Sequence, residues 1–233
     1  MEIFFTLFYQ PIFNLLIFLY TLIPLHDLGI AILLLTLIIR LLLYPLNIKA
    51  IKSQKDLQTI QPEIEKIKEK YKDDKEKMGP ELMALYKERN INPFSSCLPV
   101  LIQLPFLIAI YKVFFNILEK GEGMDALYTI IPDPGVINTI AFGFIDFVEK
   151  NIWLALLAGL AQFWQSKTMM SKKQGTTNNL MATQMMYMMP VITVVIGANF
   201  PAGLTFYWLV NTLFSVAQQY LVLDFRKEKN KQL

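Results

Sequence analysis

The chain has 233 residues, of which 54% are hydrophobic and 18% are charged, and its formal net charge is +3. A mean hydropathy of +0.40 is too high for an ordinary soluble domain and indicates an all-α polytopic membrane protein. The small net charge argues against a nucleic-acid binder. Because the chain has one cysteine and one histidine, it cannot form an internal disulfide, a cysteine metal site or a paired-histidine site, and we expect no metal and no cofactor.

The first predicted element covers residues 1–27. This segment is apolar, but it lacks the basic start of a signal peptide, and polar residues or proline interrupt it at Gln10, Pro11 and Asn14. Its large apolar residues repeat at helical spacing, at Phe4, Phe8, Ile12, Leu15 and Leu19. We therefore predict an amphipathic helix that lies in the interface on the extracytoplasmic side of the membrane. A membrane-spanning helix is the alternative.

Residues 28–223 form the predicted membrane core, and its first span runs from Leu28 to Ile48, with Tyr44 and Pro45 at its close. This stretch is uncharged except for Arg40, so a single helix would place that charge near the middle of the bilayer. A central arginine costs about 2.5 to 3.5 kcal/mol on insertion, which the surrounding leucine and isoleucine residues can offset. Thr36 lies one helical turn earlier on the same face. The middle of the other spans offers no acidic partner, which favours a hydrated functional cavity over an arginine paired inside the bundle.

Residues 49–89 change abruptly in character, with eleven Lys or Arg and nine Asp or Glu residues, and must lie in water. Two apolar stripes at helical spacing predict an antiparallel helical hairpin. The first stripe consists of Leu57, Ile60, Ile64, Ile67 and Tyr71, and the second of Met78, Leu82, Leu85 and Tyr86. Pro62 is expected to kink the first arm, and Pro80 to occupy the first turn of the second arm.

Four further apolar stretches are long enough to span a bilayer, and they cover residues 91–111, 147–168, 182–199 and 204–223. The loop of residues 116–150 holds six acidic and two basic residues, whereas lysine and arginine gather in the hairpin, in the 167–180 loop and in the tail of residues 224–233. Basic loops of membrane proteins stay in the cytosol. The charges therefore predict five spans, with the N-terminus outside and the C-terminus in the cytosol.

The sequence lacks the common enzyme motifs. It has no phosphate-binding GxxxxGK[ST] loop, no HExxH zinc helix and no intramembrane pair of carboxylates, so we expect no catalytic residues and no nucleotide hydrolysis. Polar residues do line one face of the last span, at Trp208, Asn211, Thr212 and Ser215. This face could stand opposite Thr36 and Arg40, although ordinary hydrogen bonding between helices would use the same residues.

Four ordered motifs resemble the YidC/Oxa/Alb family of membrane protein insertases, in a short bacterial form without the large periplasmic domain. They are RLLLYPLNIKAIKS, IQPEIEKIKEKY, LMALYKERNINPFSSCLPVLIQLPF and FPAGLTFYWLVNTLFSVAQQYL, and the resemblance extends from about Pro11 to Leu223. It implies a five-span core around a hydrophilic groove in the bacterial plasma membrane. It also implies that the chain inserts newly made membrane proteins and assists their folding.

The resemblance implies a role for Arg40, which would attract acidic or polar residues of the incoming protein. The resemblance also implies that five other residues line the groove or the substrate path, namely Thr36, Gln103, Gln162, Tyr207 and Trp208. The polar face of the last span adds Asn211 and Ser215 to these candidates. The implied partners are nascent membrane proteins and membrane lipids, together with the Sec translocon and the ribosome. The hairpin would capture substrates early, and the basic tail would contact the ribosome, which is the only contact with nucleic acid that we expect.

A small anion or solute transporter that binds its substrate at Arg40 is the alternative function. Transporters of that kind usually show paired repeats and broken helices, and the sequence indicates neither. A purely structural membrane scaffold is a third class, and it would tolerate the loss of Arg40 without loss of activity.

Overall fold

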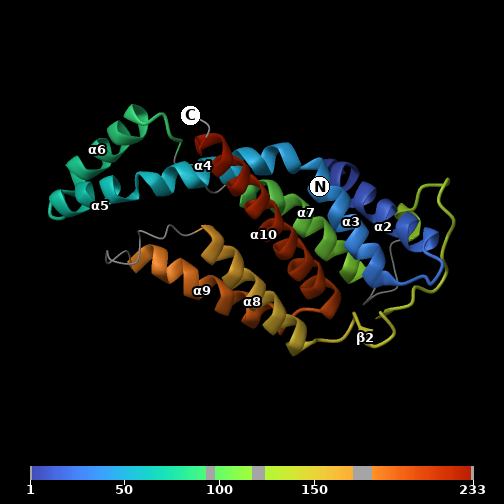
Figure 1. The fold of residues 1–233 in the computed structure, drawn as a ribbon. Coiled ribbons are helices and arrows are strands. Elements are labelled where there is room, and N and C mark those ends of the chain that lie inside the picture. Colours follow the sequence, from blue (N-terminus) through green and yellow to red (C-terminus); the bar gives the residue numbers. More distant parts are fainter. Residues whose placement is uncertain (1, 93–97, 117–123, 170–179, 232–233) are drawn as a thin grey trace.

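The structure is a computed structural model that describes residues 2–92, 98–116, 124–169 and 180–231. These ranges are mainly helical, with one short two-stranded sheet, so the predicted all-α class is confirmed in its main feature. Figure 1 shows a central helix, α10 (Ala202–Lys231), between two groups of helices. On one side lie α2 (Gln10–Leu22), α3 (Leu28–Leu42) and α7 (Leu98–Phe114), and on the other α8 (Ile152–Met169) and α9 (Leu180–Gly197).

The N-terminal segment is one helical run of 21 residues, made of α1 (Glu2–Phe4), a π-helical turn η1 (Phe5–Tyr9) and α2. Asn14, one of the polar interruptions, is almost fully buried. Its Nδ2 donates to the carbonyl oxygen of Ala126 at 2.9 Å, and its Oδ1 accepts from the backbone N–H of Tyr128 at 2.6 Å. The polar residue therefore ties this helix to a distant loop.

The first predicted span is wrong in its length. Its helix α3 ends at Leu42, and α4 (Tyr44–Thr59) continues at an angle of 69°. Pro45 explains the break, because proline has no N–H to donate to the carbonyl oxygen of Leu41, and its ring disturbs a helix at that carbonyl. Arg40 therefore lies in the last turn of α3 and not in the middle of one long helix.

A charged hairpin follows α4 and projects from the bundle (Figure 1). Its arms are α5 (Gln61–Lys70) and α6 (Lys75–Glu88), which pack against each other. Ile60, Ile64 and Leu85, all members of the two predicted stripes, form the small buried core between them.

An ion pair also joins the two arms of the hairpin. Arg89 Nη2 donates to both carboxylate oxygens of Glu63, at 3.0 and 2.9 Å, and this hydrogen bonding raises the pKa of Arg89. The chain breaks its helix at Ile60, just before Pro62, where a kink is expected. Pro80, however, is not in the first turn of the second arm, because α6 already begins at Lys75.

The remaining helices differ from the predicted spans by a few residues. Helix α7 extends to Phe114, α8 begins only at Ile152, and α10 continues to Lys231, so that it includes most of the predicted tail. The predicted start of the second span and the loop rich in lysine fall largely on residues 93–97 and 170–179, which lie outside the described residues.

The segment after residue 123 covers one end of the bundle. It contains the short helix η4 (Met124–Ala126) and an antiparallel pair of strands, β1 (Ile140–Ala141) and β2 (Ile145–Asp146). The ring of Phe142 lies against Gly29 in α3, where an added Cβ would come within 2.5 Å of it. This close approach allows the loop to pack on the start of α3.

Few helices in the described part of the chain meet the length and composition of a membrane span. The run Glu2–Leu22 does so alone, and α3 with α4 would count as a second if the bent pair is one span. Two shorter apolar helices cover Gln103–Phe114 and Met186–Gly197. Helix α10 has 30 residues, but polar side chains interrupt its apolar stretch. The count of five spans therefore stays a prediction.

Candidate functional site

Arg40 is half-buried between α3 and α10, and its described hydrogen bonds all go to α10. Its Nε donates to Oδ1 of Asn211 at 2.7 Å. Its Nη2 donates to the backbone carbonyl oxygen of Asn211 at 2.8 Å and to Oγ of Ser215 at 2.6 Å. The guanidinium thus bridges two helices that are far apart in the sequence.

The partners of Arg40 are all electrically neutral. Ser215 lies one turn after Asn211, and its Oγ donates to the carbonyl oxygen of Asn211 at 2.9 Å, so that this oxygen accepts from both Ser215 and Arg40. Within the described ranges no Asp or Glu forms an ion pair with Arg40. Dipoles therefore solvate the positive charge without neutralising it, and it can still attract an anionic group.

A second polar contact lies one helical turn before Asn211 on α10. Nε2 of Gln103 in α7 donates to the hydroxyl of Tyr207 at 2.5 Å, and Tyr207 is almost fully buried. This bond joins α7 to α10, so α10 makes hydrogen bonds with two neighbouring helices of the same group, α3 and α7.

Three predicted groove residues do not join these hydrogen bonds. Thr36 is buried, but its Oγ1 donates to the carbonyl oxygen of Ile32 in its own helix, at 2.7 Å. Trp208 and Gln162 are half-buried, and neither side chain has a hydrogen bond to another described residue. The hydrogen-bonded set around Arg40 therefore consists of Asn211 and Ser215.

Two further buried polar residues, Asn47 in α4 and Gln218 in α10, were not among the candidate groove residues. Gln218 lies three residues after Ser215, and this spacing of one turn on α10 was the signal that could have found it. Asn47 follows the 69° break, so its spacing from Arg40 along the sequence does not place it on the face of Arg40.

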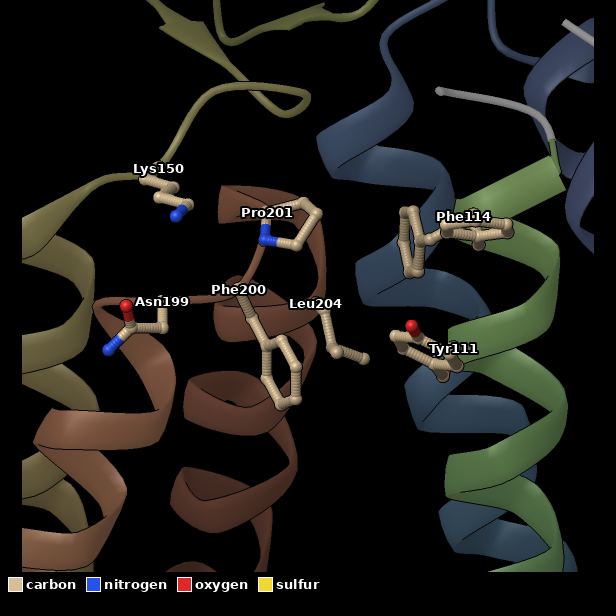
Figure 2. Close-up of a pocket in the computed structure, with 8 residues that line it drawn as sticks. Tyr111, Phe114, Lys150, Asn199, Phe200, Pro201 and Leu204 are labelled. Atoms are coloured by element: carbon tan, nitrogen blue, oxygen red, sulfur yellow. The ribbon is translucent and has the colours of Figure 1, made fainter. Parts of the chain in front are cut away.

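A separate cavity of about 290 Å³ lies at the turn between α9 and α10 (Figure 2). Its apolar wall includes Tyr111 of α7 and Phe200, whose ring centroids are 5.9 Å apart. Lys150 and Asn199 add polar groups, and Arg40 is not part of the lining. In the described part of the chain no group of three or more His, Cys, Asp or Glu residues could hold a metal ion.

Comparison with known proteins gives consistent matches. The sequence profile of a family described as 60Kd inner membrane protein matches residues 18–230. The membrane protein insertase YidC of Clostridium tetani is 39% identical over 210 residues, which cover 89% of this chain and 88% of the relative. The insertase of the same name from Fusobacterium nucleatum is 36% identical over 196 residues, which cover 84% and 85%.

Two other matches are to longer proteins. The YidC insertase of Syntrophobacter fumaroxidans is 39% identical over 198 residues, but this chain spans only 34% of its length. A crystal structure described as an active YidC insertase with the first transmembrane domain resolved matches with a TM-score of 0.65 and 30% identity. That match covers 93% of this chain and 46% of the other.

Proposed function

Because the chain belongs to the YidC/Oxa/Alb family of membrane protein insertases, we propose that it inserts newly made membrane proteins into the bacterial plasma membrane and assists their folding. The relatives that it matches along most of their length carry the name insertase. We propose that this activity involves no bond chemistry and no nucleotide hydrolysis.

The observation that carries the proposal is the charge of Arg40, which has only neutral described partners. Arg40 is half-buried, so its side chain is neither enclosed in the core nor fully exposed. In a hydrophilic groove that reaches partway across the bilayer, this charge would attract an acidic or polar tail of the incoming protein. Thr36, Gln162 and Trp208 remain proposed as further groove or path residues.

The energy for insertion would come from the substrate and from the membrane. A wet groove shortens the hydrocarbon layer that a polar tail must cross, and partition of the substrate's apolar segment into lipid then completes the insertion. An acidic tail that moves outward also gains about 2.3 kcal/mol per charge for each 100 mV of membrane potential.

In the proposed topology the five spans are α3, α7, α8, α9 and α10, with the C-terminus in the cytosol. Helix α3 has 15 residues and is therefore about 22 Å long, which is less than the roughly 30 Å of the hydrocarbon core. Its cytosolic end would then lie below the headgroups, or the bilayer would thin around it. Thinning of the bilayer brings Arg40 closer to water.

The N-terminal helix would lie on the extracytoplasmic surface. Two of its residues support this placement, because Asn14 bonds to Ala126 and Tyr128, and the hydroxyl of Tyr20 accepts from the N–H of Asn138 at 2.8 Å. These partners belong to the acidic 116–150 loop, which the charge rule places outside.

The orientation can be tested by labelling a cysteine at position 2. In a Cys97→Ser background, Glu2→Cys should react with a membrane-impermeant maleimide added to intact cells. Reaction only after lysis would place the N-terminus inside and would indicate a spanning helix.

The cytosolic parts would meet the other partners. We propose that the 49–89 hairpin contacts substrates early, that the basic 224–233 tail contacts the ribosome, and that the chain works alone or beside the Sec translocon. The excess of lysine and arginine over acidic residues in the tail supports contact with an anionic partner such as ribosomal RNA.

The central experiment is insertion by the purified chain in lipid vesicles. The substrate is a single-span protein with a short acidic N-terminal tail, and protease protection measures its insertion. The wild type should protect the tail, and Arg40→Ala should lower the rate by about tenfold, the effect of one charge contact of roughly 1.5 kcal/mol. Equal protection in vesicles without the chain would contradict the proposal.

Matched variants separate charge from shape at this site. Arg40→Lys keeps the charge and should retain most of the insertion, whereas Arg40→Gln removes the charge with a similar length and should behave like Arg40→Ala. Lys150→Ala removes a positive charge away from Arg40 and should insert the substrate at the wild-type rate.

A further inference from the structure

In the described part of the chain, the side-chain nitrogens of two buried amides have no hydrogen-bond acceptor. Asn47 is 8% exposed and Gln218 is 7% exposed, and neither Nδ2 of Asn47 nor Nε2 of Gln218 meets an acceptor in the described part of the chain. Buried amide groups are normally paired, because an unpaired one destabilises the fold. An amide that is kept in this state needs a reason outside ordinary packing.

The packing of α4 on α10 brings the two amides to one contact between helices. Asn47 belongs to α4 and Gln218 to α10, and these two helices contact each other. Four residues beyond each amide, Ile51 and Val222 belong to one apolar cluster with Met169. Residues four apart lie on the same face of a helix, so Asn47 and Gln218 lie on the faces of α4 and α10 that carry Ile51 and Val222.

The contact between α4 and α10 at this level is well suited to open. A ligand reaches the amide nitrogens only when α4 moves away from α10, because both atoms are hidden from solvent. Among the described residues a small apolar cluster lies at this contact, with Ile51, Met169 and Val222 buried in it and Ile48 packed against it. The 69° bend next to Pro45 offers a hinge, since helical hydrogen bonds are incomplete there. Opening would also let the two amide nitrogens form hydrogen bonds, which lowers the free energy of the open state.

We propose that Asn47 and Gln218 form a subsite for the polypeptide backbone of an entering segment, uncovered when α4 separates from α10. A side-chain amide carries both a donor and an acceptor, so it matches the C=O and N–H groups of an extended peptide. Such recognition does not depend on the substrate's sequence, whereas Arg40 selects negative charge. The proposal rests on the proposed insertase function and adds a step that precedes contact with Arg40.

The test compares two tails on the same single-span substrate, one with two glutamates and one with glutamines in their place. The double variant Asn47→Leu/Gln218→Met has apolar side chains of similar size. It should lower the insertion rate of both tails by the same factor, about tenfold for two lost hydrogen bonds. Arg40→Gln should instead lower the rate of the acidic tail far more than that of the neutral tail.

Thermal unfolding separates this role from a structural one. Because the double variant removes two unpaired buried amides, its Tm should equal or exceed that of the wild type. Asn199→Leu, which replaces an exposed amide at the end of α9, is the control and should insert both tails normally. Wild-type rates for both tails in the double variant would overturn the subsite, as would a loss of insertion confined to the acidic tail.

Cross-linking gives a second readout that needs no apolar substitution. In a Cys97→Ser background, Asn47→Cys should form disulfides with single cysteines in both tails of a stalled nascent chain. Cross-links from Arg40→Cys without any from Asn47→Cys would overturn the subsite. A wild type that inserts nothing would contradict the proposed insertase function itself.

Discussion

Arg40 and Asn211 are joined by two hydrogen bonds of different kinds. The side-chain oxygen of Asn211 accepts from Nε at 2.7 Å, and its backbone carbonyl oxygen accepts from Nη2 at 2.8 Å. A substitution at position 211 removes the first acceptor and leaves the second in place. The anchoring of the guanidinium can therefore be weakened without removal of its charge.

Asn211→Leu should destabilise the protein by about 1.5 to 3 kcal/mol, because it removes a hydrogen bond to a charged group that is partly buried. Thermal unfolding in detergent measures this as a lower Tm. Ser215→Ala removes one acceptor of Nη2 and leaves both acceptors of Asn211, so its Tm should fall less. The same Tm for Asn211→Leu and the wild type would show that the bond to Oδ1 does not anchor Arg40.

Gly159 allows α8 and α9 to approach closely. A Cβ at this position would lie 2.3 Å from Cγ2 of Val194 and 3.2 Å from the carbonyl oxygen of Pro190. Gly159→Ala should therefore destabilise the pair by about 1 to 3 kcal/mol through overpacking. Gly79→Ala in α6 is the matched control, because nothing lies within 4 Å of its Cβ, and it should be neutral or stabilising by up to about 1 kcal/mol. Equal shifts of Tm in both variants would contradict the close packing.

Asn14 links the N-terminal helix to the 124–128 segment through both ends of its side-chain amide. Asn14→Leu should leave the Tyr128 N–H without its acceptor and the Ala126 carbonyl oxygen with the longer bond from Gln10 Nε2, at 3.3 Å. It should therefore destabilise the protein by about 1 to 3 kcal/mol. Hydrogen exchange at the Tyr128 amide should become faster. Asn14→Asp keeps the acceptor for Tyr128 and should protect that amide better than leucine does, and identical exchange in both variants would contradict this role.

The ion pair between Glu63 and Arg89 closes the base of the hairpin on the surface. Glu63→Gln should speed hydrogen exchange in α5 and α6, at most about fivefold, because exposed ion pairs are weak. Salt should reduce the difference from the wild type. Lys77→Gln breaks a pair with Asp74 that spans only one helical turn, so exchange in α5 should not change. An effect of Glu63→Gln that persists at high salt would point to a cause other than the charge.

Helical periodicity predicted the hairpin's apolar contacts because the signal is local. Ile60, Ile64 and Leu85 were assigned to facing stripes by spacing alone, and the structure has them in one small core. In the same way, spacing puts Asn211 and Ser215 on one face of α10, and both bond to Arg40. A regular repeat within one helix is enough for such predictions.

The features that the sequence did not reveal depend on distant or irregular contacts. The sequence places the close of the first span at Tyr44 and Pro45, near the end of α3 at Leu42, but hydropathy does not reveal the 69° bend at which α4 continues. Thr36 shares the face of Arg40, but its hydroxyl bonds to its own helix, a choice that spacing does not determine. The sequence shows Asn14 only as a polar interruption of an apolar helix, because its hydrogen-bond partners lie more than a hundred residues away.

The break after α3 also has a consequence for hydrogen bonding. In a regular helix the carbonyl oxygen of Leu41 would accept from residue 45, but that residue is proline and offers no N–H. The N–H of Leu43 reaches this oxygen instead, so the chain supplies a donor within the turn itself. An unpaired carbonyl is costly in hydrocarbon. The turn therefore bends the chain one residue from Arg40 without leaving this carbonyl unpaired.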